Sequence, residues 1–319
     1  MSRFLARRLA FGLIVLWAVG TAVFILYYLA PNDPAQLIAG RQATPQTVAA
    51  VRRSLGLDKS LIHQYGSYFW RLLQGNLGYS YRNSEPVTSI LRRDFPVTAS
   101  LALGGAVLWM IIGVLSGVLA ATRPRSLADR TVTGAALLFY SMPVFLLGEL
   151  MLLVFFDRMH RAGFSFFTVT GYVGPTQSVG EWARHLILPW FSLALVQAAL
   201  YARLTRGSML DVMGEDYIRT ARAKGLRERR VVYRHGLRAA ISPVVTQFGI
   251  DLGTLLGGVI VTETVFGLPG LGKQIVDSIT GQDLPVIIAI VILASTFIVA
   301  ANIAVDALYA VLDPRVRLT

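Results

Sequence analysis

The sequence contains no cysteine, few histidines and few charged residues for its length of 319. The missing cysteines exclude disulfide bonds and thiolate metal sites. The four histidines show no pair at ligand spacing, so no metal site is predicted. Charged residues make up 15% of the chain, against about a quarter in soluble domains. With 54% hydrophobic residues, this composition indicates a membrane protein.

Long apolar runs are abundant, and a helix needs about 20 such residues to cross a bilayer. Pro143 and Pro189 are expected to bend two of the runs, which membrane helices tolerate. The first run is interpreted as a retained span, because no signal-peptide cleavage site follows it. The fold class predicted is therefore an all-α integral membrane protein with six transmembrane helices at 9–29, 99–121, 131–156, 186–202, 243–264 and 285–311.

Basic residues predict the orientation of these spans. The N-terminus, the segment between the second and third spans, residues 203–242 and the C-terminus together carry 18 basic residues, against four in the opposite short segments. The segment 30–98 is left out, because long loops do not steer topology. Both termini and residues 203–242 are therefore expected in the cytoplasm.

Two domains are expected: 1–98, with the first span and a folded extracytoplasmic segment, and 99–319, a five-helix core with a cytoplasmic loop at about 203–242. In the first, TPQTVAAVRRSLGL predicts a helix that begins at Pro45 and ends near Gly56. HQYGSYFWRLLQGNLG carries an aromatic and leucine face suited to the membrane interface. This segment is expected to cap the spans, with direct substrate contact as the alternative.

Residues 216–243 concentrate positive charge in an otherwise apolar chain. Acidic Glu215 and Asp216 begin an amphipathic helix that basic residues finish, and Gly225 follows, which suits the helix dipole and a glycine stop. A second helix is expected at about 226–240. The segment could contact anionic lipid, bind nucleic acid, or dock a cytoplasmic protein. Nucleic acid fits poorly, because the loop is short and lies between two spans, and docking is favoured.

Several motifs resemble those of one family of transporters. DYIRTARAKGL at 216–226, V-x-x-R-H-x-L-R at 231–238 and the Pro-Val that follows resemble the cytoplasmic loop of ABC-importer permeases. GNLGYS at 75–80, TETVFGLPGLG at 262–272 and YAVLDPRVR at 309–317 resemble the B-type subunit of its dipeptide/oligopeptide/nickel branch. The general family motif E-A-A, three residues, glycine falls on Arg219-Thr220-Ala221 and Gly225, without the leading acid.

The resemblance implies a type I permease fold in a bacterial cytoplasmic membrane. It implies a homologous C-type permease as partner, two ATPases that hold ATP and Mg, and an extracytoplasmic binding protein; no cofactor is expected on this chain. The loop would be a coupling helix seated in an ATPase groove, where small Ala221 and Ala223 permit close docking. Its residues would be Asp216, Tyr217, Ile218, Arg219, Thr220, Ala221, Arg222, Ala223, Lys224 and Gly225.

GLPGLGKQ at 267–274 nearly matches the phosphate-binding pattern G-x-x-x-x-G-K-[ST]. Gln274 stands where a magnesium-binding hydroxyl is needed, and no soluble strand precedes the segment. A turn and short helix outside the membrane is predicted instead. No nucleophile–base pair or metal cluster is apparent, so the chain is not expected to be an enzyme.

Four acids at or near predicted membrane depth are candidates for the translocation path: Asp251, Glu149, Glu263 and Asp306. Buried acids are costly in a bilayer and need a cavity or a partner. Hydrogen bonding between helices is the favoured alternative for all four. Gly249, Gly253 and Gly257 form a small-residue face on which another helix is expected to approach closely.

The predicted function is a permease subunit for short peptides, with nickel chelates, glutathione or haem as alternative substrates. Two other classes remain open. A secondary transporter would require an inverted repeat and paired broken helices, and residues 1–160 hold no counterpart of 216–243. A membrane scaffold would use the basic loop to hold a soluble partner without transporting a solute.

Overall fold

The computed structural model describes residues 2–29, 34–39, 43–54, 56–164, 166–167 and 171–312. This described part is helical, apart from an isolated bridge between Tyr79 and Pro86. Contacts divide the chain into two compact units. Unit 1 comprises residues 1–94 and 274–303, and unit 2 comprises 95–273 and 304–319. The first boundary lies near the expected one at 98, but residues 274–303 group with the N-terminal part.

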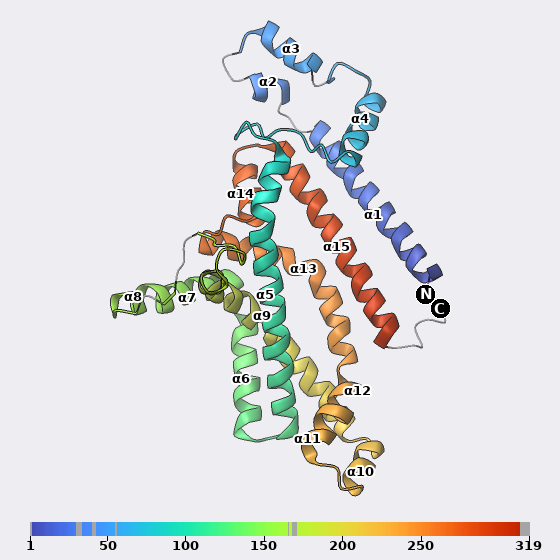
Figure 1. Cartoon of the computed structure of the whole chain (residues 1–319), viewed down its shortest axis with the longest axis vertical. Coiled ribbons are helices and arrows are strands. Elements are labelled where there is room, and N and C mark those ends of the chain that lie inside the picture. Colours follow the sequence, from blue (N-terminus) through green and yellow to red (C-terminus); the bar gives the residue numbers. More distant parts are fainter. Residues whose placement is uncertain are drawn as a thin grey trace. The chain divides into compact units, whose positions relative to one another are not determined.

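Unit 1 is built from two long apolar helices and several short ones (Figure 1). Its helices are α1 (Ser2–Leu29), α2 (Pro34–Ala39), α3 (Pro45–Ser54), α4 (Leu61–Leu73), the start of α5 (Val87–Thr122), most of α14 (Leu271–Thr280) and α15 (Leu284–Leu312) as far as Ile303. The expected helix start at Pro45 is confirmed, with the Thr47 amide donating to the Thr44 hydroxyl at 3.3 Å. The expected turn at Gly56 has φ +70°.

Aromatic side chains join α4 to α1. Phe24 and Tyr65 pack edge to face with ring centroids 5.3 Å apart, and the Thr21 and Tyr65 hydroxyls lie 2.8 Å apart. Gly20 leaves room for the Phe69 ring, which would lie 3.0 Å from an added Cβ. Further along α1, a Cβ at Gly12 would lie 2.7 Å from Val299 of α15. The apolar face predicted for α4 therefore packs against a span.

Unit 2 is a helical bundle around the contact between two long helices. Its elements are the rest of α5, α6 (Leu127–Ser141), α7 (Val144–Met151), the π-helical η1 (Leu152–Arg158), α8 (Met159–Arg161), α9 (Val179–Met213), α10 (Asp216–Ala223), α11 (Glu228–Arg230), the π-helical η2 (Val231–Leu237), α12 (Arg238–Ala240) and α13 (Ser242–Phe266). Trp109 of α5 and Tyr201 of α9 are fully buried in its core. Gly113 and Gly117 bring α5 against α9, because a Cβ there would lie 2.4 Å from Tyr201 and 2.6 Å from Thr205.

Helices occupy all six predicted spans, but only four are unbroken: α1, α5, α9 and α15. α9 continues through Pro189 without a break, so a bend at this residue stays a prediction. The other two candidates are bent pairs, one of them α13, whose halves meet at 65°. By length and composition, the described residues thus hold four spans, or six if each bent pair is one span.

The bend at Pro143 is confirmed and is large, since α6 and the run from Val144 to Arg161 meet at 106° (Figure 1). Met142 is extended, with ψ 129°, as expected for a residue before proline. α6 alone has 15 residues and is about 22 Å long, shorter than a hydrocarbon core of about 30 Å. Residues 131–156 are therefore not one straight membrane helix.

Candidate functional site: the loop between α9 and α13 and the buried acids it adjoins

The loop between α9 and α13 contains the two helices predicted from its charge pattern. The first is α10, which follows an extended Glu215 and carries Asp216 in its first turn. It ends at Ala223, and Gly225 takes φ +73° in the turn that follows, a conformation that favours glycine. The second is one continuous helical run, from α11 through η2 to α12. The local prediction for this loop is therefore confirmed.

A small buried cluster supports α10 from within the loop itself. Ile218 and Val231 are fully buried and Ala221 is 7% exposed, with Met213 and Leu226 packed against them. Ala221 was expected to allow close docking on another protein, but here its methyl group faces its own loop. Because successive residues rotate by about 100° around a helix, Arg219 and Ala223 lie on the opposite, exposed side.

An ion pair closes the turn after α10. The Arg222 guanidinium donates to both Glu228 carboxylate oxygens, at 2.8 and 3.2 Å. This hydrogen bonding holds the pKa of Glu228 below its usual value. Both side chains are substantially exposed, so the pair contributes well under 1 kcal/mol. The pair spans the turn that contains Gly225.

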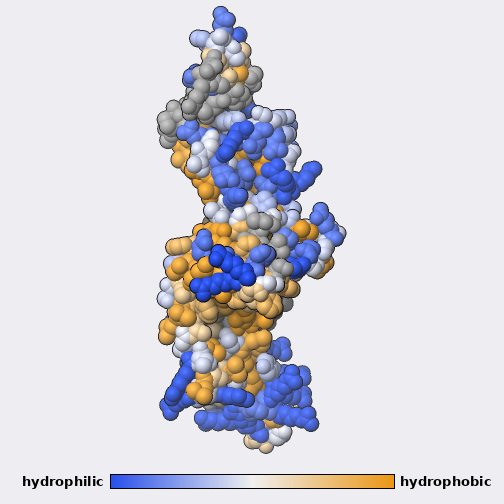
Figure 2. All heavy atoms as spheres, turned by 90° about the vertical axis from the view of Figure 1, so that its left-hand side faces the viewer, coloured by the Kyte–Doolittle hydropathy of each residue, from blue (hydrophilic) through white to orange (hydrophobic). Residues whose placement is uncertain are grey.

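The loop is also fastened to the ends of two long helices. Val232 of η2 and Ala240 of α12 pack with Met209 of α9 and Val118 of α5. Gly236 allows this approach, since an added Cβ would lie 3.0 Å from the Met213 sulfur. Hydrophilic residues gather at this end of unit 2, beside an apolar surface (Figure 2). The second helical run of the loop is therefore packed against the ends of α5 and α9.

Asp251 is buried between the same two helices that the loop connects. The Tyr201 hydroxyl donates to one of its carboxylate oxygens at 2.9 Å, and the Gln247 amide donates to the other at 2.9 Å. Tyr201 belongs to α9, while Gln247 and Asp251 belong to α13. Asp251 is 7% exposed. It therefore has the partners that an acid at this depth requires.

Glu263 is fully buried and caps the start of α14. One carboxylate oxygen accepts from the Thr98 hydroxyl at 2.7 Å, and the other accepts from the backbone amides of Gly272 and Lys273 at 2.7 and 3.0 Å. These amides belong to the first turn of α14, where a negative charge is stabilised by the helix dipole. The residues that resembled a phosphate-binding loop thus surround a carboxylate of this chain.

The four candidate acids do not form one cluster in the described structure. Asp251 and Glu263 lie in different halves of the bent α13 and have different hydrogen-bond partners. Glu149 is exposed on α7. Asp306 belongs to α15, but its side chain lies outside the described residues. A role for any of the four in the translocation path stays a prediction.

The surroundings of only one of the three glycines in the predicted small-residue face of α13, Gly257, are described. An added Cβ at Gly257 would meet nothing within 4 Å, whereas one at Gly258 would lie 2.9 Å from Leu193. Gly249 is buried, and the surroundings of Gly253 lie outside the described residues. Gly258 therefore allows a close approach of α13 to α9, and the role of the predicted glycine face stays a prediction.

An ion pair that the sequence does not predict joins α6 to α9. The Arg206 guanidinium donates to both oxygens of Asp129, at 2.6 and 2.9 Å. The Ser126 hydroxyl caps α6 by accepting from the Asp129 amide at 3.3 Å. The signal available was Ser126 followed by Asp129, a pattern typical of helix starts. Nothing in the local sequence indicates Arg206 as the partner.

Comparison with known proteins agrees with this architecture. Residues 113–318 match the family "binding-protein-dependent transport system inner membrane component", and residues 1–102 match the N-terminal part of the same kind of component. A solved structure of a methionine ABC transporter in inward-facing conformations is similar in fold, with a TM-score of 0.56, 24% identity, and coverage of 72% of this chain and 99% of that one.

Curated relatives are similar over their full length. A probable peptide ABC transporter permease of Sinorhizobium fredii is 40% identical over 99% of this chain and 100% of its own. A di/tripeptide transport permease of Pseudomonas aeruginosa is 39% identical, and a glutathione transport permease of Escherichia coli is 40% identical, each over 99% of both chains. With its apolar helices, this chain is a multi-pass protein of the bacterial inner membrane. It belongs to the binding-protein-dependent inner membrane components, as a permease of the dipeptide/oligopeptide branch of ABC importers.

Proposed function

We propose that the chain is one transmembrane subunit of an ATP-driven importer for short peptides. It forms the translocation path with a homologous partner permease and is driven by two cytoplasmic ATPases, which hold ATP and Mg. A separate binding protein delivers the substrate. The names of the relatives, which include peptide, di/tripeptide and glutathione permeases, support this substrate class. Glutathione, nickel chelates and haem are the alternative substrates.

The observation that carries the proposal is the position of α10. It rests on the buried cluster of Ile218, Ala221 and Val231 and leaves Arg219 and Ala223 exposed. A short helix held in this way can transmit the closure of an ATPase as a rigid-body movement. The 18 to 4 distribution of basic residues supports a cytoplasmic position for this loop.

The route of this movement follows from the packing of the loop. α10 continues from α9 through Gly214, and η2 and α12 lead into α13. These two helices share the Tyr201–Asp251 hydrogen bond. We therefore infer that rotation of α9 against α13 opens and closes the path. The chain itself hydrolyses no ATP in this scheme.

The test is binding-protein-stimulated ATP hydrolysis by the complete complex in lipid, with Ala223→Arg in the loop. An arginine there projects from the exposed side of α10 and leaves its buried cluster intact, so the complex should remain folded while stimulated hydrolysis falls by at least about tenfold, the effect of about 1.4 kcal/mol. Ala162→Arg is the matched control, because Ala162 is also exposed but follows α8. Unchanged hydrolysis and transport in Ala223→Arg would refute the docking role of α10.

The test also separates the other classes of function. A secondary transporter would take up solute without any ATPase, and a membrane scaffold would produce no uptake in either variant. Peptide uptake that requires ATP, and that is lost in Ala223→Arg alone, supports the importer.

A further inference from the structure

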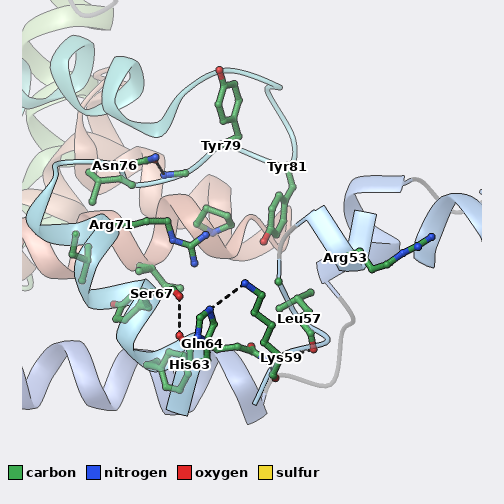
Figure 3. Close-up of a pocket in the computed structure, with 18 residues that line it drawn as sticks. Arg53, Leu57, Lys59, His63, Gln64, Ser67, Arg71, Asn76, Tyr79 and Tyr81 are labelled. Carbon is green, nitrogen blue, oxygen red and sulfur yellow. Dashed lines mark hydrogen bonds between the residues drawn. The ribbon is translucent and has the colours of Figure 1, made fainter. Parts of the chain in front are cut away.

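Unit 1 contains a cavity of about 540 Å³ that takes no part in the proposed coupling. Its walls come from α4, from the turn before α4 and from the segment 76–81 (Figure 3). Phe24, near the end of α1, and Pro285 and Ile288, at the start of α15, complete the lining. The cavity thus lies where two apolar candidate spans end.

The polar lining of this cavity is cationic. Arg53, Lys59, His63 and Arg71 contribute to it, and no aspartate or glutamate does so among the described residues. Figure 3 shows Lys59, His63 and Arg71 directed into the cavity, whereas Arg53 points away from it. The Lys59 ammonium lies 3.1 Å from a ring nitrogen of His63. Within the described part of the chain, Arg71 has no carboxylate partner for its side chain.

Further donors surround these cations. Tyr79 and Tyr81 line the cavity beside Asn76, and Figure 3 shows Tyr81 directed towards Arg71 and Lys59. The Tyr68 hydroxyl, in the α4 wall, is buried without a hydrogen-bond partner among the described residues. Burial raises the pKa of this phenol to about 12, so it remains a donor at neutral pH. Cations and hydroxyl donors together suit an anion with several oxygen atoms.

The neighbouring helices are those with the least covered apolar surface. In the most apolar stretch of α1 only 22% is buried within the protein, and in that of α15 only 17%. The corresponding share in α9 is 61%. Leu26, just beyond Phe24, is 68% exposed, and Trp70 on α4 is 63% exposed. Exposed aromatic side chains at the end of a span are typical of the membrane interface. An acyl chain can therefore lie along α1 and α15 while its polar end reaches the cavity.

The lining also discriminates between anions. A short peptide carries an ammonium group as well as a carboxylate, and the described lining offers no acid to pair with that ammonium. A phosphate diester is purely anionic and is matched by guanidinium and ammonium donors. We propose that this cavity binds the phosphate headgroup of an anionic membrane lipid, whose acyl chains lie against α1 and α15.

The experiment uses the full chain in nanodiscs of zwitterionic phosphatidylcholine that contain a trace of photoactivatable phosphatidylglycerol, with cross-linked peptides mapped by mass spectrometry. Cross-links should concentrate in residues 57–81 and exceed those of a photoactivatable phosphatidylcholine. The double variant Lys59→Gln/Arg71→Gln should lower them about 25-fold, at about fivefold for each cation near an anionic lipid. Arg92→Gln is the matched control, because Arg92 is exposed in the same unit and does not line the cavity.

Three outcomes would overturn the proposal. Equal labelling by the two lipids would show that the cavity does not select an anionic headgroup. Labelling that the double variant retains would place the lipid elsewhere. Displacement of the lipid probe by inorganic phosphate or glycerol phosphate alone would assign the cavity to a soluble phosphate. Elution volume and thermal unfolding of each variant verify that unit 1 remains folded.

Discussion

Replacing Glu263 by glutamine tests whether its buried carboxylate holds α5, α13 and α14 together. Among its described contacts, the carboxylate accepts hydrogen bonds from the Thr98 hydroxyl and from the amides of Gly272 and Lys273. A bond to a charged group contributes about 1.5–3 kcal/mol and a neutral one about 0.5–1.5 kcal/mol. Glutamine keeps the size but loses the charge, and its NH2 group cannot accept the hydrogen bonds made by one of the two carboxylate oxygens, so we expect a loss of about 1 kcal/mol for each bond. The expected destabilisation is therefore about 3 kcal/mol.

The assay is thermal unfolding of the purified chain in detergent, followed by tryptophan fluorescence. A loss of about 3 kcal/mol corresponds to a decrease in Tm of about 6 to 12 °C for a domain of this size. The control is Glu181→Gln, because the Glu181 side chain is 45% exposed and its pair with Arg184 is a surface contact, so its Tm should change little. An unchanged Tm in Glu263→Gln would refute the reasoning, since the contacts of the carboxylate would then contribute nothing to the stability of the fold.

Two other substitutions test packing and charge. Gly117→Ala should lower Tm, because the added Cβ would lie 2.7 Å from the Ala202 carbonyl oxygen of α9, and such overpacking costs about 1–3 kcal/mol. The control is Gly207→Ala, which should be neutral or stabilising because Gly207 faces open space on α9. An equal change in Tm in the two variants would contradict the contact. Glu228→Gln should lower stability by about 0.5 kcal/mol at neutral pH. Arg222 lowers the pKa of Glu228 from its usual value of 4.5. The stabilisation by the ion pair is therefore present above pH 4.5 and is lost as the pH falls through the lowered pKa of the folded state. The melting curves of variant and wild type should then converge in acid. A difference that persists there would point to packing instead.

Local chemistry explains which parts of the fold could be predicted. The start of α3 at Pro45, the end of α10 before Gly225 and the bend at Pro143 each depend on one residue and its neighbours. Helix positions followed from apolar length alone. These features are set by interactions within a few residues, and the sequence displays them directly.

Features that depend on distant partners could not be predicted. Asp129 and Arg206 are 77 residues apart, and the sequence does not indicate their pairing. Ala221 was assigned to an outer docking surface because the family motif marks it, yet it packs against Val231 across the turn. The sequence indicates only that Glu263 is an acidic residue near the end of a predicted span. The fold shows that its partners include backbone amides of the next helix.

The Asp129–Arg206 pair also constrains how the protein is made. α6 leaves the ribosome before α9. Arg206 follows Asp129 by 77 positions, which corresponds to about 4 to 15 s at a synthesis rate of about 5–20 residues per second. During that interval, the Arg206 guanidinium is not available to Asp129. Its own segment supplies substitutes, since the Arg125 amide donates to it at 2.9 Å and the Thr133 hydroxyl at 3.4 Å. Until α9 is synthesised, the Arg125 amide and the Thr133 hydroxyl are therefore available as hydrogen-bond donors to the Asp129 carboxylate.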